Sequence, residues 1–329
     1  MRKLVLLLVV SAVVAGGWFF FQQYQLRGLD QVSLIPRTSA GEPGYADAGP
    51  PPPSVERQNG AIRIASFNIQ VFGVKKLGKP RVRSLLAEIV RRFDIVAIQE
   101  IRANQDILPQ FIDTINAGGR HYDFVIGPRL GRTVSKEQYA YVFDTASIEV
   151  DRNALYTVSD PDDLLHRDPF VGWFRVRGPP PEQAFTFSLV DIHTEPDKAR
   201  EELDAMGDVF RAVRDDGRGE DDVIVLGDLN ADDHHLGRLG QISHIHCAIS
   251  GVASNTRGTK LYDNLIFSDV ATTEFTGRWG VFDMIREFNL TTEEALEVSD
   301  HMPVWAEFNL YEGGQGGRMA TRPFGAKTQ

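Results

Sequence analysis

The sequence predicts an α/β fold in which two β-sheets pack against each other and helices lie outside them. Two observations support this prediction. Short runs rich in β-branched and aromatic residues stand between turn signals, as strands do, and apolar residues at helix spacing separate several of the runs. The chain of 329 residues is 42% hydrophobic and 24% charged, a composition that excludes disorder, collagen and a coiled coil as overall descriptions.

The expected elements follow from these patterns. Strands are predicted where apolar runs lie between turn residues, over residues 62–71, 95–99, 124–126, 139–143, 171–176, 185–192, 223–226, 262–267 and 303–308. Helices are predicted where apolar residues recur three and four positions apart, over residues 80–93, 106–116 and 197–214. All of them fall within about 250 residues, a length typical of one two-sheet domain.

Residues 1–27 hold a segment suited to a membrane. Arg2 and Lys3 precede an apolar run over residues 4–21, close to the roughly 20 residues that cross a bilayer. We interpret residues 1–27 as a retained membrane anchor or as a cleaved signal segment, and a buried core helix is the remaining alternative. Both membrane interpretations place the following domain outside the cytoplasm, in the periplasm or the extracellular space.

Three further regions are expected after this segment. Residues 28–60 are rich in Pro, Gly, Ala and Ser and contain four consecutive prolines, which predicts a linker. The folded domain is expected over residues 61–311, and a loose Gly-rich tail over residues 312–329. Nothing in these patterns implies a protein partner, so we expect a monomer.

Charge and cysteine content limit the kinds of partner and site. The chain carries 35 Lys and Arg against 45 Asp and Glu, a net charge of −10. An acidic protein has no general attraction for a phosphate backbone, so a nucleic-acid or phospholipid role requires a local patch or bound cations. The single cysteine, Cys247, excludes an intrachain disulfide and a thiolate zinc site.

Polar residues stand within or next to several predicted strands. Each alone is typical of a turn or a helix cap, but together they indicate one edge of a sandwich where convergent groups form a site. They are Asn68 in SFNIQVFG, Glu100 at the end of DIVAIQE, His193 at the end of FSLVDIH, Asp228 and Asn230 in VIVLGDLN, and Asp300 and His301 before PVWAEF.

The oxygen-bearing members of this set suit a hard cation. Glu100, Asp228 and Asp300 offer anionic oxygens. Asn68 and Asn230 add neutral amides, and such a donor set favours Mg²⁺ or Mn²⁺ over zinc. We therefore expect a site for a divalent metal ion, with Ca²⁺ as a further candidate.

Two histidines of the set remain for proton transfer near neutral pH. Glu137 is a candidate to orient His193, and Asp263 is a candidate to orient His301. A cation neutralises oxygen charge, amides steady a crowded phosphorus centre and imidazoles move protons. This combination indicates attack on a phosphoester.

Seven segments carry a resemblance to a known family. In chain order they are SFNIQVFG, IVAIQEIR, KEQYAYVF, LVDIHT, VIVLGDLNAD, LYDNLIFS and VSDHMPVW. Over about residues 62–310, their order and spacing resemble the endonuclease/exonuclease/phosphatase superfamily, and most of all its deoxyribonuclease I branch. The resemblance implies a four-layer α/β sandwich of two packed mixed sheets flanked by helices. It also implies a divalent-cation site and phosphodiester hydrolysis by in-line attack of water.

The resemblance further implies roles for the oxygen-bearing residues. Glu100 resembles the principal metal ligand of the family, with Asp300 near the same ion or a second one. The resemblance also implies that Asp228 and Asn230 lie near the same ion or a second one. Asn68 and Asn230 resemble the amides that position the phosphate.

The histidines resemble the two histidine–carboxylate pairs of the deoxyribonuclease branch. His193 with Glu137 is one pair, and His301 with Asp263 is the other. One side activates water and the other protonates the leaving oxygen, and the sequence leaves open which pair does which.

Several arginines and one departure bear on the substrate. Arg102 and Arg167 match positions at which the branch contacts nucleic acid, and Arg132 is a further candidate of the same kind. Where the branch usually has a tyrosine, this chain has Ser135. The resemblance therefore indicates the reaction more firmly than the substrate.

Three functions follow from these observations. The first is a metal-dependent phosphodiesterase that cuts DNA as a deoxyribonuclease I-like endonuclease. The second is the same chemistry on a phospholipid or small phosphoester, as in sphingomyelinase-like or inositol-phosphate phosphatase-like relatives. The third is a non-catalytic, membrane-tethered binding module. The implied partners are DNA and, through the N-terminal segment, a membrane.

Four other histidines have no place in this set. His234 and His235 follow two aspartates, and His244 and His246 alternate along a possible strand. They indicate either a second metal site or a polar loop and a surface strand.

Overall fold

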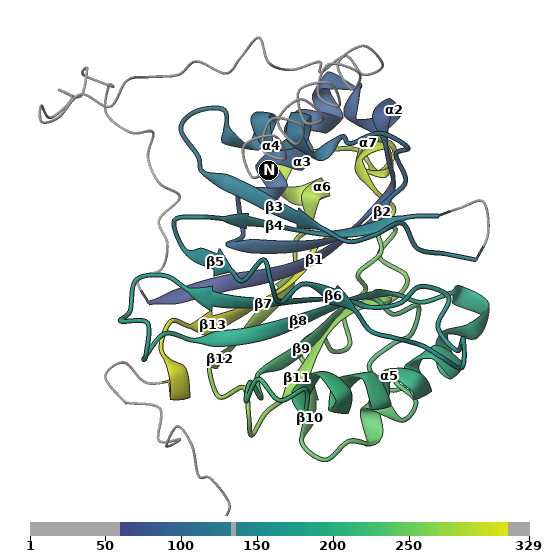
Figure 1. Ribbon diagram of the computed structural model, residues 1–329. Helices are drawn as coiled ribbons and strands as arrows, with labels where there is room; N and C mark the ends of the chain where they lie inside the picture. The colour runs from purple at the N-terminus through teal and green to yellow at the C-terminus, as the bar shows by residue number, and fades with distance from the viewer. Residues whose placement is uncertain (1–59, 133–135, 315–329) are drawn as a thin grey trace, which may run out of the picture. The chain divides into compact units, whose positions relative to one another are not determined.

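The computed structural model describes residues 60–132 and 136–314 (Figure 1). The predicted membrane segment over residues 1–27, all but the last residue of the predicted linker, Ser135 and most of the predicted tail lie outside these residues. Within the described ranges, no helix has the length and apolarity needed to cross a bilayer.

The first sheet has six strands in the order β12-β13-β1-β2-β4-β3. β1 pairs in parallel with β2 and antiparallel with β13. Every residue of β2 is buried, because this central strand is covered on both faces. The strands are β1 (Ala61–Phe72), β2 (Ile95–Ile101), β3 (Tyr122–Ile126), β4 (Gln138–Asp144), β12 (Phe275–Val281) and β13 (Val304–Asn309).

The second sheet has seven strands, six of them in the order β10-β11-β9-β8-β7-β5 and β6 beside β7. Its centre is the parallel pair of β8 and β9, and the other pairings are antiparallel. The strands are β5 (Ile148–Val150), β6 (Tyr156–Thr157), β7 (Phe170–Val176), β8 (Thr186–His193), β9 (Val223–Asp228), β10 (Ile245–Cys247) and β11 (Asp263–Ser268).

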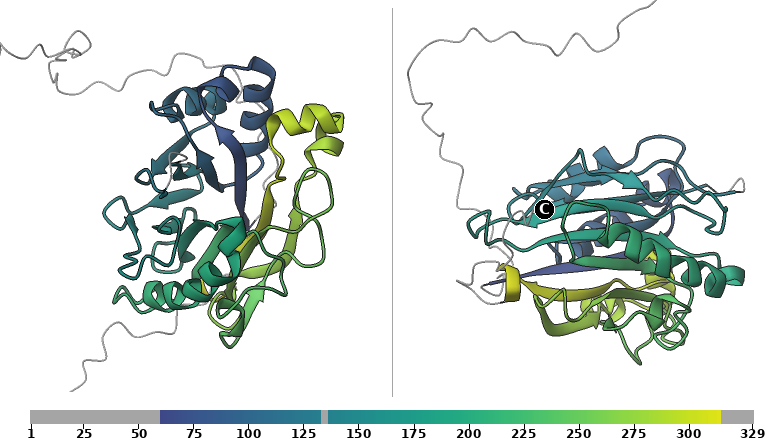
Figure 2. Two further views of the ribbon diagram at one scale, coloured as in Figure 1. Left: turned by 90° about the vertical axis from the view of Figure 1, so that its right-hand side faces the viewer. Right: turned by 60° about the horizontal axis from the view of Figure 1, so that its bottom comes forward.

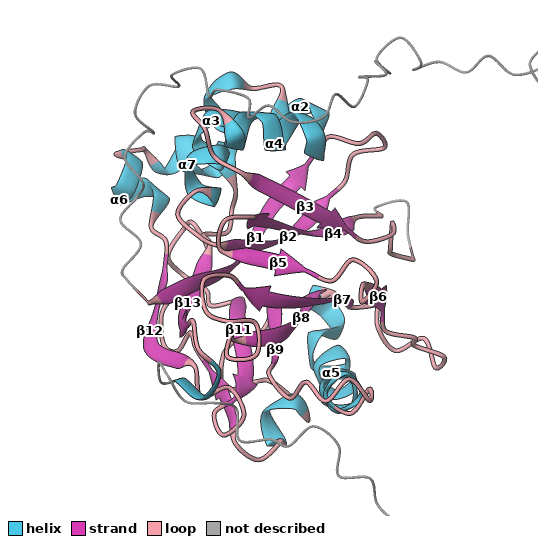
Figure 3. Cartoon of the chain, turned by 60° about the vertical axis from the view of Figure 1, so that its left-hand side comes forward, coloured by secondary structure: helices cyan, strands magenta, loops and turns pink. Residues whose placement is uncertain are grey.

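Helices cover the outer faces of both sheets (Figures 2 and 3). The first sheet is covered by α2 (Val74–Leu77), α3 (Pro80–Val90), α4 (Leu108–Asn116), α6 (Met284–Phe288) and α7 (Thr292–Val298). The second sheet is covered by α5 (Ala199–Arg214). Three short 3₁₀ turns are η2 (Pro196–Lys198), η3 (Leu239–Gln241) and η4 (Glu312–Gly314).

The apolar core divides into three clusters that match these layers. One lies between the first sheet and its helices, one between the two sheets, and one between the second sheet and α5. Helix, sheet, sheet and helix therefore stack in four layers, which confirms the predicted α/β sandwich. The predicted helices over residues 80–93, 106–116 and 197–214 correspond to α3, α4 and α5.

Some elements were not predicted from the sequence. These are β5, β6, β12, α2, α6 and α7, whereas β10 corresponds to the possible strand of His244 and His246. β12 has only half-buried and exposed residues, so it lacks the apolar run used to find strands. α7 begins with a capping box in which Thr291 and Glu294 bond each other's backbone, a signal that its sequence, TTEE, does contain.

Candidate active site

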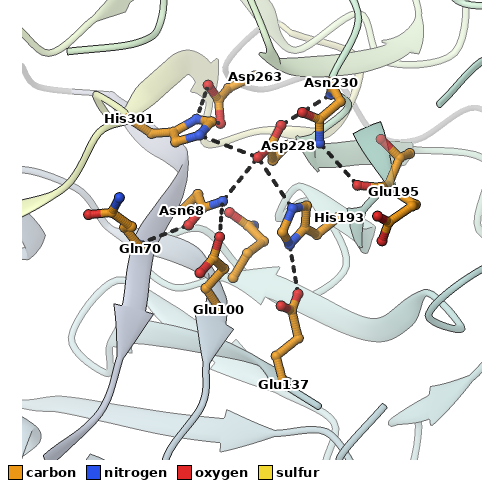
Figure 4. A network of polar contacts seen from close by, with 12 residues as sticks. Asn68, Gln70, Glu100, Glu137, His193, Glu195, Asp228, Asn230, Asp263 and His301 are labelled. Carbon is orange, nitrogen blue, oxygen red and sulfur yellow. Dashed lines mark hydrogen bonds and ion pairs between the residues drawn. The ribbon is translucent and has the colours of Figure 1, made fainter. Parts of the chain in front are cut away.

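The polar residues singled out from the sequence meet at one edge of the two sheets (Figure 4). β1 runs parallel to β2, and β8 runs parallel to β9, so their carboxyl ends lie at shared edges. β11 and β13 run antiparallel to their neighbours and begin at that edge. The residues brought together are Asn68 in β1, Glu100 in β2, Glu137 before β4, His193 ending β8, Asp228 ending β9, Asp263 opening β11 and His301 before β13.

Asp228 is the centre of this network and is 2% exposed. Its Oδ2 accepts a hydrogen bond from Asn68 Nδ2 at 3.0 Å. The same oxygen lies 3.5 Å from Nε2 of His193 and 3.5 Å from Nε2 of His301. Its Oδ1 accepts the backbone N–H of Asn230 at 3.1 Å. One carboxylate is therefore approached by two imidazoles from distant parts of the chain.

The first imidazole, His193, is held by a buried carboxylate. Its Nδ1 lies 2.8 Å from Glu137 Oε1, and its backbone N–H donates to the Tyr139 hydroxyl at 2.9 Å. Burial lowers the pKa of His193, but the hydrogen bond to Glu137 and the charges of Glu137 and Asp228 raise the pKa more, so the net shift is upward. Because Nδ1 is engaged, Nε2 is the atom available for proton exchange.

The second imidazole, His301, has the same arrangement on the other side. Its Nδ1 lies 2.9 Å from Asp263 Oδ2, and the Ser254 hydroxyl donates to that oxygen at 2.6 Å. Burial opposes the charged imidazole, but the carboxylates of Asp263 and Asp228 raise the pKa of His301 well above its usual value. Each of the two histidine–carboxylate pairs thus presents the Nε2 atom of its imidazole to Asp228.

Glu100 stands next to this hydrogen-bonded centre in an unusual backbone conformation. Its φ of 62° and the φ of 46° at Asn230 lie in the left-handed region, which non-glycine residues adopt rarely and often at functional sites. Glu100 Oε1 accepts from Asn68 Nδ2 at 3.2 Å, and Oε2 accepts the backbone N–H of Val71 at 2.7 Å. These two donors and the guanidinium of Arg102, 3.0 Å from Oε2, hold the carboxylate in place.

The glycine before Asp228 is required by the close approach of two strands. Gly227 has a φ of 146°, and a Cβ at this position would lie 1.8 Å from the carbonyl oxygen of Ile192. Any other residue would push β9 away from β8. Gly227 therefore allows Asp228 and His193 to end neighbouring strands at contact distance.

The donor set at this edge fits a hard divalent ion. Glu100 and Asp228 are joined through one amide nitrogen of Asn68, and carboxylate oxygens of this kind suit Mg²⁺ or Mn²⁺. Ligand atoms of Asp228, Asp263 and His301 also lie within 4.8 Å of one another. Asp263 and His301 are already paired, so Glu100 and Asp228 are the better ligands.

Two predicted ligands occupy other positions than expected. Asn68 donates from its amide nitrogen to the two carboxylates, and its Oδ1 accepts the backbone N–H of Gln70, so in this orientation the amide holds the two acids together. The Asp300 side chain is 45% exposed and has Oδ1 4.0 Å from His301 Nε2. Asp300 therefore lies at the outer side of the network.

Two of the predicted substrate arginines lie inside the site. Arg102 reaches Glu100 Oε2 at 3.0 Å and Glu137 Oε2 at 3.6 Å, and its side chain is 27% exposed. Arg167 is only 5% exposed, with Nε 3.2 Å from Glu137 Oε1 and Nη1 donating to the carbonyl of His193 at 3.0 Å. Burial raises the pKa of Glu137, but the hydrogen bond and charge of His193, followed by the charges of Arg167 and Arg102, hold it below its usual value.

The third arginine, Arg132, lies on a loop away from this network. Its guanidinium bonds the Asp163 carboxylate at 3.0 Å, the Asp163 carbonyl, and the Leu165 carbonyl at 2.8 Å. Arg132 thereby holds the loop that leads to Arg167. The structure does not bring Arg132 together with the histidines.

Sequence reasoning missed several residues that support the site. Lys76 Nζ donates to the carbonyls of Val298 at 2.8 Å and Ile69 at 3.3 Å, and burial lowers its pKa to about 8 despite the charges of Asp300 and Glu100. Tyr139 and Ser254 were missed as well. Their hydroxyls bond the histidine network only through long-range contacts, for which no sequence motif exists.

The four other histidines singled out from the sequence do not form a common site. The side chains of His234 and His235 are 83% and 77% exposed, and His235 Nδ1 bonds Asp232 at 2.6 Å. His244 lies 3.6 Å from Asp269, and His246 packs between two phenylalanine rings. Among the described residues, no cluster of three metal-ligand side chains includes any of them.

The chain is similar to known proteins over most of its length. A family model described as Endonuclease/Exonuclease/phosphatase family matches residues 65–287. Deoxyribonuclease gamma of Rattus norvegicus is 32% identical over 268 residues, covering 76% of this chain and 84% of that protein. Deoxyribonuclease-1-like 1 of Sus scrofa is 34% identical over 262 residues, covering 76% of this chain and 81% of that protein.

A solved structure shows the same fold at lower identity. An endonuclease/exonuclease/phosphatase family protein from Bacteroides thetaiotaomicron superposes with a TM-score of 0.52 and 18% identity, covering 76% of this chain and 98% of that chain. The residues matched by the family model include Asn68 through Asp263 of the site, and His301 follows them.

Proposed function

The chain belongs to the endonuclease/exonuclease/phosphatase family, and on that premise we propose that this hydrolase is a deoxyribonuclease I-like endonuclease that uses Mg²⁺ or Mn²⁺. The observation that carries the proposal is the pair of imidazoles whose Nε2 atoms lie 3.5 Å from one carboxylate oxygen, each with Nδ1 on a buried acid. Hydrolysis of a phosphodiester needs one group to accept a proton and another to donate one.

The residues of the site divide the reaction between them. A divalent ion held by Glu100 and Asp228 would neutralise charge on the phosphate oxygens. Asn68 donates its two amide hydrogens to Glu100 and Asp228 and so keeps these two carboxylates in place beside each other. One imidazole accepts the proton of the attacking water at Nε2, and the other donates a proton to the leaving oxygen. Glu137 and Asp263 keep the two rings oriented.

Two observations support DNA as the substrate. The curated relatives at 32% and 34% identity are named deoxyribonucleases. Arg102 is 27% exposed beside the predicted metal ligand Glu100, where a strand backbone would pass. An acidic protein needs such a local cation to approach DNA.

A panel of substrates tests the proposal. The purified full chain is given supercoiled plasmid, linear DNA, RNA, sphingomyelin and inositol phosphates with Mg²⁺, Mn²⁺ or chelator. We expect metal-dependent nicking of the plasmid, lost in Asp228→Asn and kept in the control Asp113→Asn, an exposed residue of α4. Cleavage of a lipid or small phosphoester with no cleavage of DNA would assign the second chemistry. Inactivity on every substrate would indicate a binding module.

We further propose that residues 1–27 direct the protein to a membrane and that the domain works outside the cytoplasm as a monomer. The apolar run over residues 4–21 after Arg2 and Lys3 supports this. Fractionation with protease added to intact cells, together with the mass of the mature N-terminus, separates an anchor from a cleaved signal. Protection of the domain from external protease would refute the location, and sedimentation as a dimer would refute the monomer.

A further inference from the structure

Three acidic side chains from distant parts of the chain meet at the opposite end of β9. Asp222 directly precedes β9, Glu274 directly precedes β12, and Glu312 opens η4. One oxygen of each lies within 4.8 Å of the other two. η4 is the short yellow turn at the lower left of Figure 1, on the side where β1 begins.

The first two carboxylates of this group are fully buried. Asp222 is 1% exposed and Glu274 is 0% exposed. Burial, followed by the negative charges of Glu274, Glu220 and Glu312, raises the pKa of Asp222 well above its usual value. Like charges held together inside a protein are unfavourable unless protons or a cation neutralise them.

Unpartnered oxygens inside the cluster point to a cation. Asp222 Oδ1 is buried and accepts no hydrogen bond of normal geometry within the described ranges. The hydroxyl of Thr272, which is 1% exposed, lies near the Asp222 carboxylate, and its Oγ1 also lacks a partner at hydrogen-bond geometry. Buried oxygens without donors are rare because each costs free energy, and both of these are suitable ligands for a hard cation.

The chemistry of the ligands suits calcium. Ca²⁺ accepts several carboxylates in flexible geometry, while Mg²⁺ usually retains water ligands. A set of three acids, two of them fully buried, and a buried hydroxyl therefore matches calcium better.

We propose that Asp222, Glu274 and Glu312 form a structural Ca²⁺ site that fastens η4 to the starts of β9 and β12. The site is separate from the candidate active site, because the six residues of β9 span about 20 Å at roughly 3.3 Å per residue. It does not rest on the proposed function. Bound Ca²⁺ stabilises the folded chain by preferring it over the unfolded chain.

Calcium binding is measured on the full chain carrying Glu100→Gln, which removes the predicted ligand of the active site. Equilibrium dialysis with Ca²⁺ alone should give one ion per chain. Thermal unfolding should shift upward by about 5–10 °C when free Ca²⁺ exceeds the dissociation constant about a hundredfold. Absence of both binding and shift would overturn the proposal.

A second substitution locates the ion. Adding Glu312→Gln should abolish both the bound Ca²⁺ and the thermal shift, while adding Glu201→Gln, an exposed position on α5, should change neither. In chelator, Glu312→Gln should be at least as stable as the background because it removes a repelling charge. Asp222→Asn repeats the test at a second ligand. Undiminished Ca²⁺ binding by the folded Glu312→Gln and Asp222→Asn variants would place the ion elsewhere and refute the site.

Discussion

The two ends of β9 present the same residue type in opposite surroundings. At the carboxyl end, Asp228 is met by an amide nitrogen of Asn68 and by the imidazoles of His193 and His301. Before the first residue, Asp222 is met by other carboxylates and by a hydroxyl. Both aspartates are almost completely buried.

This difference shows that the neighbouring side chains determine the role of a buried carboxylate. Groups that exchange protons surround Asp228, so its end of the strand can support a reaction. Carboxylates and a hydroxyl surround Asp222, without an imidazole among them, so its end suits an ion that stabilises the fold. Acidity and burial alone do not distinguish a catalytic edge from a structural one.

The largest expected effect comes from removing a proton-transfer group at the catalytic end. His301→Ala should lower turnover by about a hundredfold or more, since a general acid or base is lost. The unfolding midpoint should change little relative to this loss. Plasmid nicking rates and thermal unfolding of the same preparation measure both, and a folded variant with wild-type turnover would reject the role of His301.

A smaller loss is expected from Arg167, which separates positioning from DNA contact. Arg167→Ala removes the guanidinium that bonds Glu137 and the His193 carbonyl, so turnover should fall about tenfold on both plasmid and a small activated phosphodiester. In Arg102→Ala the loss should be greater on plasmid, because that side chain is more exposed. The measurement is the turnover of each variant on both substrates, expressed as the ratio of plasmid to small phosphodiester. A loss confined to plasmid in Arg167→Ala would show that this residue contacts DNA.

A still smaller loss of turnover is expected from replacing Arg132, because this residue acts only through the loop of Asp163 and Leu165. Arg132→Ala should lower turnover about threefold by loosening the loop that carries Arg167. Arg132→Lys should not restore it, because lysine lacks the fork that bonds several acceptors at once. Rates at low and high salt check this, and a loss that disappears at high salt would favour the original prediction that Arg132 contacts DNA.

The smallest effect is expected at the opposite end and depends on pH. Burial and the nearby charge of Glu274 raise the pKa of Glu312 from 4.5 to about 7. The folded chain therefore binds this proton more tightly than the unfolded chain. The resulting stability is fully present below about pH 4.5 and is lost as the pH rises through about 7.

This pH effect is measured by urea unfolding in chelator at about pH 5.5 and about pH 8. The free energy of unfolding should fall more between these values in the wild type than in Glu312→Gln. Turnover with Mg²⁺ should be nearly the same in both. Identical pH dependence of stability in the two proteins would contradict the shifted pKa of Glu312.

The catalytic end could be predicted from the sequence to a large extent. Asn68, Glu100, His193 and Asp228 lie within or at the ends of strands whose apolar runs are easily recognised, and parallel neighbours bring such ends together. The family and the four-layer fold were likewise predicted from the order of the motifs. Residues that support the site were not, as Tyr139 shows.

The opposite end was beyond sequence reasoning. Asp222, Glu274 and Glu312 are separated by 52 and 38 positions in the numbering, and no spacing rule joins them. Glu274 precedes β12, a strand that lacks a clear apolar run. Only the tertiary fold brings these acids together, so a cluster of this kind becomes visible once both sheets are assembled.

One assay directly tests whether catalysis belongs to the Asp228 end of β9, because it compares variants from both ends of this strand. The initial rate of plasmid nicking is followed over a range of Mg²⁺ concentrations for the wild type, Glu100→Gln and Glu312→Gln. We expect Glu100→Gln to lose about a hundredfold or more in rate and Glu312→Gln to stay within about twofold of the wild type. Full activity of a folded Glu100→Gln variant, or equal losses in both variants, would contradict the assignment of catalysis to the Asp228 end of β9.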